Sequence, residues 1–157
     1  MRDDVLTGGF ADAPVEAARA FRSALTALAR PGRIETLAGA QAPAPFSPAA
    51  ATLLLTLCDG ETPLYLAGAH DTGAVHDWIA FHIGAPIVGA RQAVFAIGTW
   101  QALSPLDALP TGTAEYPDRS ATLIVEGEAL EAKGQRLTGP GIQSEAHLNL
   151  PETAAFR

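Results

Sequence analysis

The clearest pattern along the chain is a stripe of apolar residues between residues 13 and 29. Its members recur at three- and four-residue intervals, the spacing of one helix face: Val15, Ala18, Phe21, Leu25 and Leu28. Asp12 is placed to cap the first turn, Pro14 fits within that turn, and Arg30-Pro31-Gly32 ends the helix. The pattern predicts an amphipathic helix from about Ala13 to Ala29.

Two more helices are predicted where a capping residue precedes an apolar run. Ser47 and Pro48 open the first of them, and Thr72 precedes the second. The first is apolar nearly all round, which predicts that it is buried. The expected ranges run from residue 48 to about 58 and from 73 to about 83, with a short helix after residue 105.

Short apolar runs bounded by turn residues predict β-strands between these helices. The runs cover residues 33–37, 64–67, 85–88, 93–97 and 121–130. The last one is expected to turn back at Lys133-Gly134 into Arg136-Leu137-Thr138 as an antiparallel hairpin. The tail from Gly141 onward predicts no element. Together these predict an α/β fold, a three-layer α/β/α sandwich around a mixed sheet.

Composition restricts the classes of protein to consider. The chain has 157 residues, 48% of them hydrophobic, which predicts one folded domain over residues 1–157. Its net charge is -7 and it has no basic run, so neither nucleic acid nor a membrane surface is an expected partner. A lone cysteine, Cys58, and an N-terminus without the layout of a secretory signal favour a cytoplasmic location.

No catalytic or metal-binding constellation stands out. His70, His76, His82 and His147 have none of the spacings that zinc sites use, so no metal is expected. Cys58 is predicted in mid-helix surrounded by leucine, where desolvation disfavours the thiolate, and no nucleophile motif is present. We therefore assign no catalytic residue.

The charged side chains indicate neither a cofactor site nor a general acid or base. Lys133 is the only lysine and lies in a predicted turn beside Glu131, where solvent reaches it, so a pyridoxal phosphate aldimine is not expected and no cofactor is assigned. Glu126, Glu128 and Glu131 follow an emerging strand and are interpreted as a solvated face.

Two loops combine glycine and threonine in a way that could present backbone amides to an anion. They are the loops Thr111–Thr113 and Arg136–Ile142, and turns that need a positive φ are the plainer explanation of both. The candidate contacts for a small anion or a partner protein are Thr111, Gly112, Thr113, Arg136, Thr138 and Gly139.

Several segments, in this order, are together similar to one family. They are Phe21-Arg22 with Pro31-Gly32, Leu53-Leu54-Leu55-Thr56-Leu57 with Asp59 and Thr62-Pro63, Phe81-His82 with Ala85-Pro86, Thr111-Gly112-Thr113 with Ala121-Thr122-Leu123-Ile124, and Arg136-Leu137-Thr138-Gly139-Pro140-Gly141-Ile142. Each motif is weak alone, but five in the right order are specific. On these residues the chain resembles the PhnH family, a subunit of the bacterial carbon-phosphorus lyase system.

The resemblance implies a non-catalytic subunit of a core complex in organic phosphonate catabolism. That complex makes α-D-ribose 1-methylphosphonate 5-triphosphate from ATP and methylphosphonate, as part of a transferase. The resemblance also implies a homodimer, contacts with the other core subunits, and a fold similar to a reduced pyridoxal-phosphate transferase without the cofactor lysine. The family's C-terminal segment is expected to be missing from this chain.

Two alternatives stay open from the sequence. The chain could be a free-standing transferase-like enzyme, or a small-anion binding protein, that uses the loops Thr111–Thr113 and Arg136–Ile142. It could also be a plain dimeric scaffold that only buries partner surface.

Overall fold

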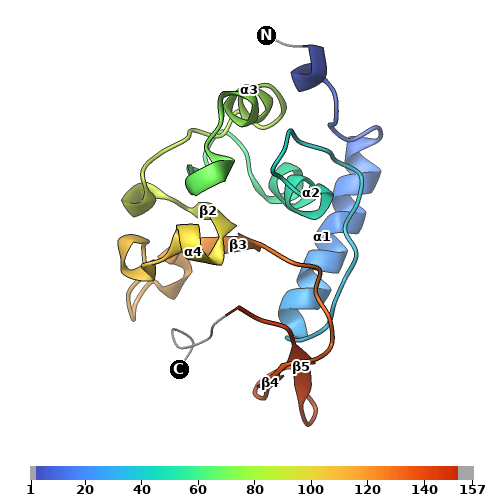
Figure 1. Ribbon diagram of the computed structural model, residues 1–157, viewed down its shortest axis with the longest axis vertical. Helices are drawn as coiled ribbons and strands as arrows, with labels where there is room; N and C mark the ends of the chain where they lie inside the picture. The colour runs from blue at the N-terminus through green and yellow to red at the C-terminus, as the bar shows by residue number, and fades with distance from the viewer. Residues whose placement is uncertain (1–2, 152–157) are drawn as a thin grey trace.

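A computed structural model describes residues 3–151 of the chain (Figure 1). Its helices and strands, in chain order, are α1 (Ala13–Ala29), α2 (Pro48–Leu57), β1 (Leu64–Leu66), α3 (Gly73–His82), β2 (Phe95–Thr99), α4 (Trp100–Leu103), β3 (Thr122–Glu126), β4 (Gln135–Leu137) and β5 (Ala146–Leu148). Short 3₁₀ turns connect them. None of the described helices is long and apolar enough to cross a membrane.

The three long helices lie where the sequence predicts them, and two have the expected caps. The Ser47 hydroxyl accepts a hydrogen bond from the Ala50 N–H (3.1 Å), and Thr72 does the same for α3. The start of α1 differs, because the Asp12 side chain makes no capping hydrogen bond. Instead, the Glu16 carboxylate accepts from the Asp12 N–H (2.8 Å).

The main sheet within residues 3–151 contains β1, β2 and β3 in that order, all parallel. Tyr65 lies opposite Ala96, and Ala96 lies opposite Leu123. Of the predicted strand at 85–88, the structure forms only a single bridge, in which Ile87 pairs with Leu64. The predicted strand at 33–37 is wrong, because this segment has no strand pairing. The parallel sheet is therefore smaller than the apolar runs suggest.

The predicted hairpin at the edge of a mixed sheet is also wrong. β3 ends at Glu126, and β4 pairs instead with β5, antiparallel, in a separate two-stranded sheet. The Asn149 side chain, just after β5, accepts from the Glu131 N–H (2.6 Å) and donates to the Ala129 carbonyl (2.9 Å). The tail therefore carries a strand, and it holds residues 129–131 beside that strand.

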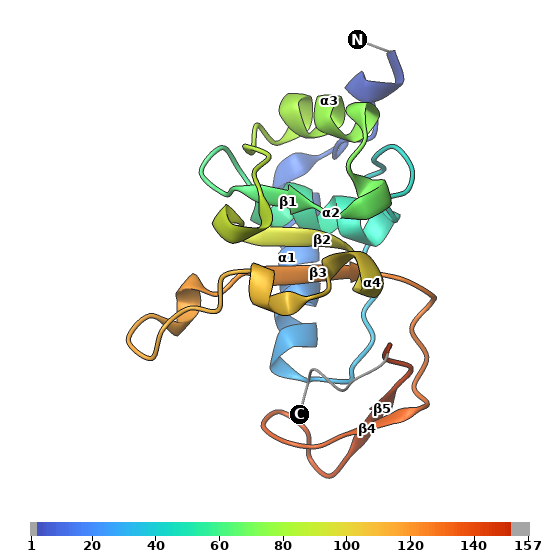
Figure 2. The ribbon, with the colours of Figure 1, turned by 60° about the vertical axis from the view of Figure 1, so that its left-hand side comes forward.

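Apolar side chains cover both faces of the parallel sheet. Alternate residues of a strand point to opposite faces. Leu64 and Leu66 accordingly join one buried cluster with Leu54 of α2 and Trp78 of α3. On the other face, residues of β1 and β2 join a second cluster with Leu103 of α4. Helices therefore contribute to the core on both sides of the strands, and Figure 2 shows α1 crossing behind the three strands while α4 lies in front.

Helix α1 is oriented opposite to what its apolar stripe suggests. It packs against α2 (Figure 1), and its buried and half-buried positions include the small residues Ala17, Ala20, Ser23, Ala24 and Ala27. Phe21, Leu25 and Leu28 of the stripe are 52%, 55% and 77% exposed. The helix is amphipathic as predicted, but its large apolar side chains face away from the core.

Candidate functional site

The first candidate loop, Thr111–Thr113, is closed on itself by hydrogen bonds. The Thr113 hydroxyl accepts from the Tyr116 N–H (3.0 Å), and the Thr113 N–H donates to the Tyr116 carbonyl (3.2 Å). Gly112 has a φ of +73°, and a Cβ added there would lie 3.0 Å from the Tyr116 carbonyl oxygen. Thr111 forms a bridge with Ser120. These contacts account for the glycine and both threonines as parts of a tight turn.

Arg136 of the second candidate loop lies on β4, opposite His147 of β5. Its Nε donates to the Glu145 carboxylate (2.8 Å), and its side chain is 66% exposed. Most of the Arg136 side chain is exposed, which leaves it accessible to an anion or a partner protein.

The two glycines of the second loop, Gly139 and Gly141, have different surroundings. Gly139 has a φ of +132° and open space around it. Gly141 has a φ of +83°, and a Cβ there would lie 2.3 Å from the Ala29 carbonyl oxygen at the end of α1. Thr138 lies between β4 and this turn. The loop is therefore packed under the C-terminal end of α1 at Gly141 and open at Gly139.

The structure does not bring the two candidate loops together. Figures 1 and 2 agree in placing the segment around residues 111–120 on one side of the molecule and the β4–β5 hairpin at its lower end. No hydrogen bond or ion pair joins the two loops among the described residues. Thr111, Gly112 and Thr113 thus form one surface feature, and Arg136, Thr138 and Gly139 form another.

Lys133 and Cys58 lie in the surroundings that the sequence predicts for them. Lys133 is 68% exposed, and its Nζ lies 2.8 Å from the Glu131 carboxylate. The mid-helix position predicted for Cys58 is wrong, because Cys58 is the residue just after α2. Burial raises the pKa of its thiol to about 12, with the Asp59 charge adding to the shift and a hydrogen bond with Thr62 opposing it. The thiol is therefore protonated at neutral pH.

The contacts of the histidines are with backbone and side-chain groups of the domain itself. The Nε2 of His82 lies 3.1 Å from the carbonyl oxygens of Val5 and Thr7, so His82 ties the N-terminal segment to α3. His76 pairs with Asp71. His70 is buried, and neither of its ring nitrogens has a hydrogen-bond partner among the described residues. Within residues 3–151 no group of histidine, cysteine and carboxylate side chains could hold a metal ion.

Glu126 corrects the prediction of a solvated acidic face. At the end of β3, its carboxylate accepts a hydrogen bond from the Ser47 N–H (2.7 Å) at the start of α2. A carboxylate at a helix N-terminus offsets the positive end of the helix dipole. Glu126 therefore joins β3 to α2, while Glu128 and Glu131 are exposed as expected. Its sequence position at a strand end gave no signal of this contact.

Two shallow hollows lie around the loop that precedes α1. One, of about 460 Å³, is lined by Thr7, Gly8, Gln41, Ala42 and Pro43. The other, of about 450 Å³, is lined by residues including Phe10, Leu55 and His82. Neither hollow includes a residue of the two candidate loops. The sequence did not indicate either of them.

These features define an α/β domain built on parallel strands, an architecture that serves many functions. Comparison with known proteins is more specific. Residues 8–157 match a family described as bacterial phosphonate metabolism protein (PhnH). The chain belongs to the PhnH family, as its ordered motifs predict.

Two relatives support this assignment. The chain is 43% identical over 150 residues to the α-D-ribose 1-methylphosphonate 5-triphosphate synthase subunit PhnH of Rhizobium meliloti strain 1021, covering 91% of this chain and 74% of that one. It is 30% identical over 154 residues to the putative C-P lyase subunit protein HtxG of Stutzerimonas stutzeri, covering 90% of this chain and 73% of that one. Both relatives carry the name of a subunit.

Proposed function

We propose that the chain is a non-catalytic subunit of a carbon-phosphorus lyase core complex in organic phosphonate catabolism. In this role it supports the formation of α-D-ribose 1-methylphosphonate 5-triphosphate from ATP and methylphosphonate. The observation that carries the proposal is the 43% identity, over 91% of the chain, to a relative named as a subunit of that synthase. A protonated Cys58 and an exposed, ion-paired Lys133 agree with a chain that adds no nucleophile of its own.

The finer parts of the proposal follow from the family. We place the chain in the cytoplasm, as one domain over residues 1–157 and as a homodimer bound to the other core subunits. The fold would be a reduced form of the pyridoxal-phosphate-transferase sandwich without the cofactor lysine. The two apolar clusters, one on each face of the parallel sheet, support a layered arrangement of this type.

Complementation tests the proposed function. A phosphonate-utilising bacterium that lacks its own PhnH subunit should regain growth on methylphosphonate as sole phosphorus source when it expresses this chain. Growth on inorganic phosphate serves as the control. If the expressed and folded chain does not copurify with the other core subunits and does not restore growth, the proposal is wrong.

A free-standing enzyme is tested with the purified chain. Incubated alone with ATP and methylphosphonate, it should release no adenine. Measurable turnover by the chain alone would favour the transferase-like alternative.

The exposed Arg136 loop is proposed as a contact for an anion or a partner subunit. Arg136→Ala should reduce copurification with the core subunits and slow growth on methylphosphonate, because it removes the exposed guanidinium while the β4–β5 pairing remains. Lys133→Ala is the matched control, since Lys133 is equally exposed and ion-paired in the same region. Unchanged assembly and growth in Arg136→Ala would remove this loop from the proposal. The same test applied to Thr113→Ala would examine the other loop.

A further inference from the structure

Helix α1 carries more exposed large apolar side chains than any other element of the described residues. They are Val15, Phe21, Leu25 and Leu28. At about 100° per residue, the last three share an arc of about 60° on the helix, and Val15 lies outside that arc. Exposed apolar residues scattered singly are normal, whereas large ones gathered on one arc indicate an interaction surface. Phe21, Leu25 and Leu28, with the exposed Ala18, form the outward face of α1.

The outward face has the spacing at which one helix packs along another. Ala18, Phe21, Leu25 and Leu28 follow one another at intervals of three, four and three residues. Their exposure rises toward the end of the helix, from 52% at Phe21 to 77% at Leu28. The small side chain of Ala18 leaves room for a larger side chain of a second helix. A helix with apolar residues at the same intervals would therefore bury all four.

A positive charge without a partner borders this face on one side. Arg22 lies about 60° round the helix from Leu25. Arg19, three residues earlier, is its neighbour on the helix surface. Both arginine side chains are exposed, and neither forms an ion pair or a side-chain hydrogen bond within residues 3–151. The outward face is thus apolar with a basic border.

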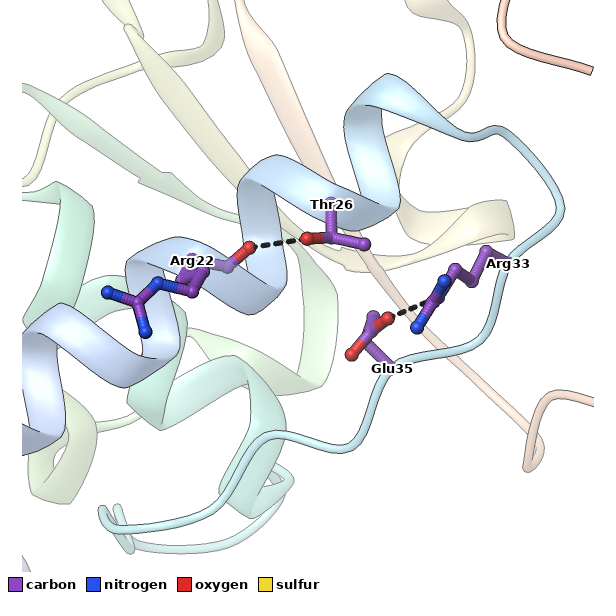
Figure 3. A network of polar contacts seen from close by, with 4 residues as sticks. All are labelled: Arg22, Thr26, Arg33 and Glu35. Atoms are coloured by element: carbon purple, nitrogen blue, oxygen red, sulfur yellow. Dashed lines mark hydrogen bonds and ion pairs between the residues drawn. The ribbon is translucent and has the colours of Figure 1, made fainter.

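The acidic groups of this region are engaged elsewhere. Figure 3 shows Glu35 paired with Arg33 (2.5 Å), while the guanidinium of Arg22 points away from both. The contact that Arg22 makes there is through its backbone carbonyl, which accepts from the Thr26 hydroxyl (2.9 Å). Glu16, the carboxylate within α1, accepts from a backbone N–H at the start of the helix. The Arg22 guanidinium is therefore available to a carboxylate of another molecule, although the chain as a whole has a net charge of -7.

Two other occupants fit these charges less well. In an antiparallel pair of identical helices the same flank of each helix meets, so a second copy would bring Arg22 toward Arg22 and supply no carboxylate. An anionic membrane attracts basic groups but repels a chain whose net charge is -7. A helix that carries carboxylates beside its apolar residues matches both the outward face and its basic border.

We propose that the outward face of α1 is the docking surface for an acidic amphipathic helix of a different polypeptide. Apolar residues of that helix pack on Phe21, Leu25 and Leu28, and its carboxylates lie on the side of Arg22. Arginine suits this contact because its guanidinium can bind a carboxylate through two hydrogen bonds. The inference rests on the proposed function in that the partner is sought among the other core subunits.

Photo-cross-linking identifies the occupant. The full chain, with p-benzoylphenylalanine in place of Leu28, is expressed in a phosphonate-utilising bacterium that lacks its own PhnH subunit. After illumination, mass spectrometry should place the cross-link in a helical segment of another core subunit that carries Asp or Glu beside its apolar residues. The same group at Phe81 of α3, which is 54% exposed, is the control and should not give this product. A cross-link to a second copy, to lipid or to a segment without carboxylates, or no cross-link, would overturn the proposal.

Binding of variants tests the apolar part of the surface. Core subunits purified from the same strain are titrated onto the immobilised chain. Leu25→Glu should weaken binding about 30-fold or more, the effect of losing an interface anchor. Phe81→Glu is the matched control, since Phe81 and Leu25 are similarly exposed, and circular dichroism should show both variants folded. Equal binding by Leu25→Glu and the wild type would overturn the proposal.

Charge reversal tests the basic border. Arg22→Glu should weaken binding about fivefold at low salt, and the difference from the wild type should shrink as the salt concentration rises. Arg91→Glu makes the same change in net charge at another exposed arginine and should bind like the wild type. Equal losses in the two variants would reduce the effect to net charge and overturn the acidic partner.

Vesicle binding and growth separate the remaining outcomes. The wild-type chain should not cosediment with phosphatidylglycerol vesicles, and cosedimentation that Leu25→Glu abolishes would assign the face to a membrane instead. A wild-type chain that restores growth on methylphosphonate, together with a Leu25→Glu variant that binds the core subunits equally well, would refute the docking surface alone. A wild-type chain that neither restores growth nor binds the core subunits would refute the proposed function as well.

Discussion

At the scale of single residues, burial decides the chemistry of the two side chains that most resemble functional groups. Cys58 packs against the main apolar cluster, and its thiol is held in the protonated form. His70 lies edge-on to Phe46, with 5.3 Å between the ring centroids, and its nitrogens have no partner among the described residues. Both residues belong to the packing of the domain rather than to a reactive centre.

Cys58 should react slowly with alkylating agents. The thiolate is the reactive form, and with a pKa of about 12 the folded protein contains little of it at pH 8. We expect alkylation by iodoacetamide at pH 8 to be on the order of a hundred-fold or more slower in the folded protein than in guanidinium chloride, measured by mass spectrometry. Similar rates in the two states would show that Cys58 is accessible as thiolate.

The same shift predicts a loss of stability in alkali. The unfolded thiol releases its proton near pH 9.0, while the folded thiol keeps it until about pH 12. The contribution of Cys58 to stability is therefore complete below pH 9 and is lost as the pH rises toward 12. In urea titrations between pH 8 and 10.5, the wild type should lose more stability than Cys58→Ala does. Parallel pH dependences in the two proteins would contradict this prediction.

Replacing His70 should stabilise the domain. A buried polar group without a hydrogen-bond partner costs about 1–3 kcal/mol, so His70→Leu should raise the free energy of unfolding by about 1 kcal/mol. Thr52→Val is the contrasting variant, because the Thr52 hydroxyl is equally buried but accepts from the Ala40 N–H (3.2 Å). It should lower stability by a similar amount. Urea unfolding measures both, and a clear loss of stability in His70→Leu would indicate an unseen partner for the imidazole.

At the scale of elements, local signals predicted the helices well and the strand partners poorly. Ser47 and Thr72 fix helix starts through contacts within one turn, which sequence patterns capture. Strand pairing depends on contacts far along the chain, such as that of Asn149 with residues 129 and 131. The candidate loops were likewise located correctly as turns, but nothing local indicated that they would lie apart.

The start of α2 should be sensitive to substitution. Ser47→Ala removes the hydroxyl that accepts from the Ala50 N–H, and losing such a cap costs about 1 kcal/mol. Thr99→Ala removes the corresponding cap of the four-residue helix α4, which is more exposed, and should cost less. Thermal unfolding of the two variants checks the order. A Thr99→Ala variant that is less stable than Ser47→Ala would contradict the prediction.

At the scale of the whole molecule, the fold class followed from the alternation of helices and strands, but the split into a parallel sheet and a separate hairpin did not. The family was recognisable because the order of its sequence motifs can be followed along the chain even where the pairing of the strands cannot be predicted. The outward face of α1 was hidden from sequence analysis for a physical reason. A stripe of Phe and Leu is what a core-facing helix shows, and only the packing of alanines such as Ala20 against the core reveals which side is inside.

The attachment of the β4–β5 hairpin to the rest of the molecule should depend on Gly32. Gly32 has a φ of +92°, and a Cβ there would lie 2.5 Å from the Cβ of Ala146 on β5. Gly32→Val should therefore loosen the hairpin, so that trypsin cleaves after Lys133 and Arg136 faster than in the wild type. Gly73→Val is the control, since Gly73 has open space around it. Equal cleavage rates in Gly32→Val and the wild type would show that the hairpin is held by other contacts.

The alanine-lined inner side of α1 has a consequence for how proteins of this kind can diverge. Since the anchoring of the helix depends on small residues, substitutions on its outer side change the surface that the molecule presents and leave its interior untouched. A few changes at positions such as 21, 25 and 28 would thus alter the exposed surface of this helix without disturbing its packing. The surface chemistry of one helix would then evolve independently of the stability of the domain.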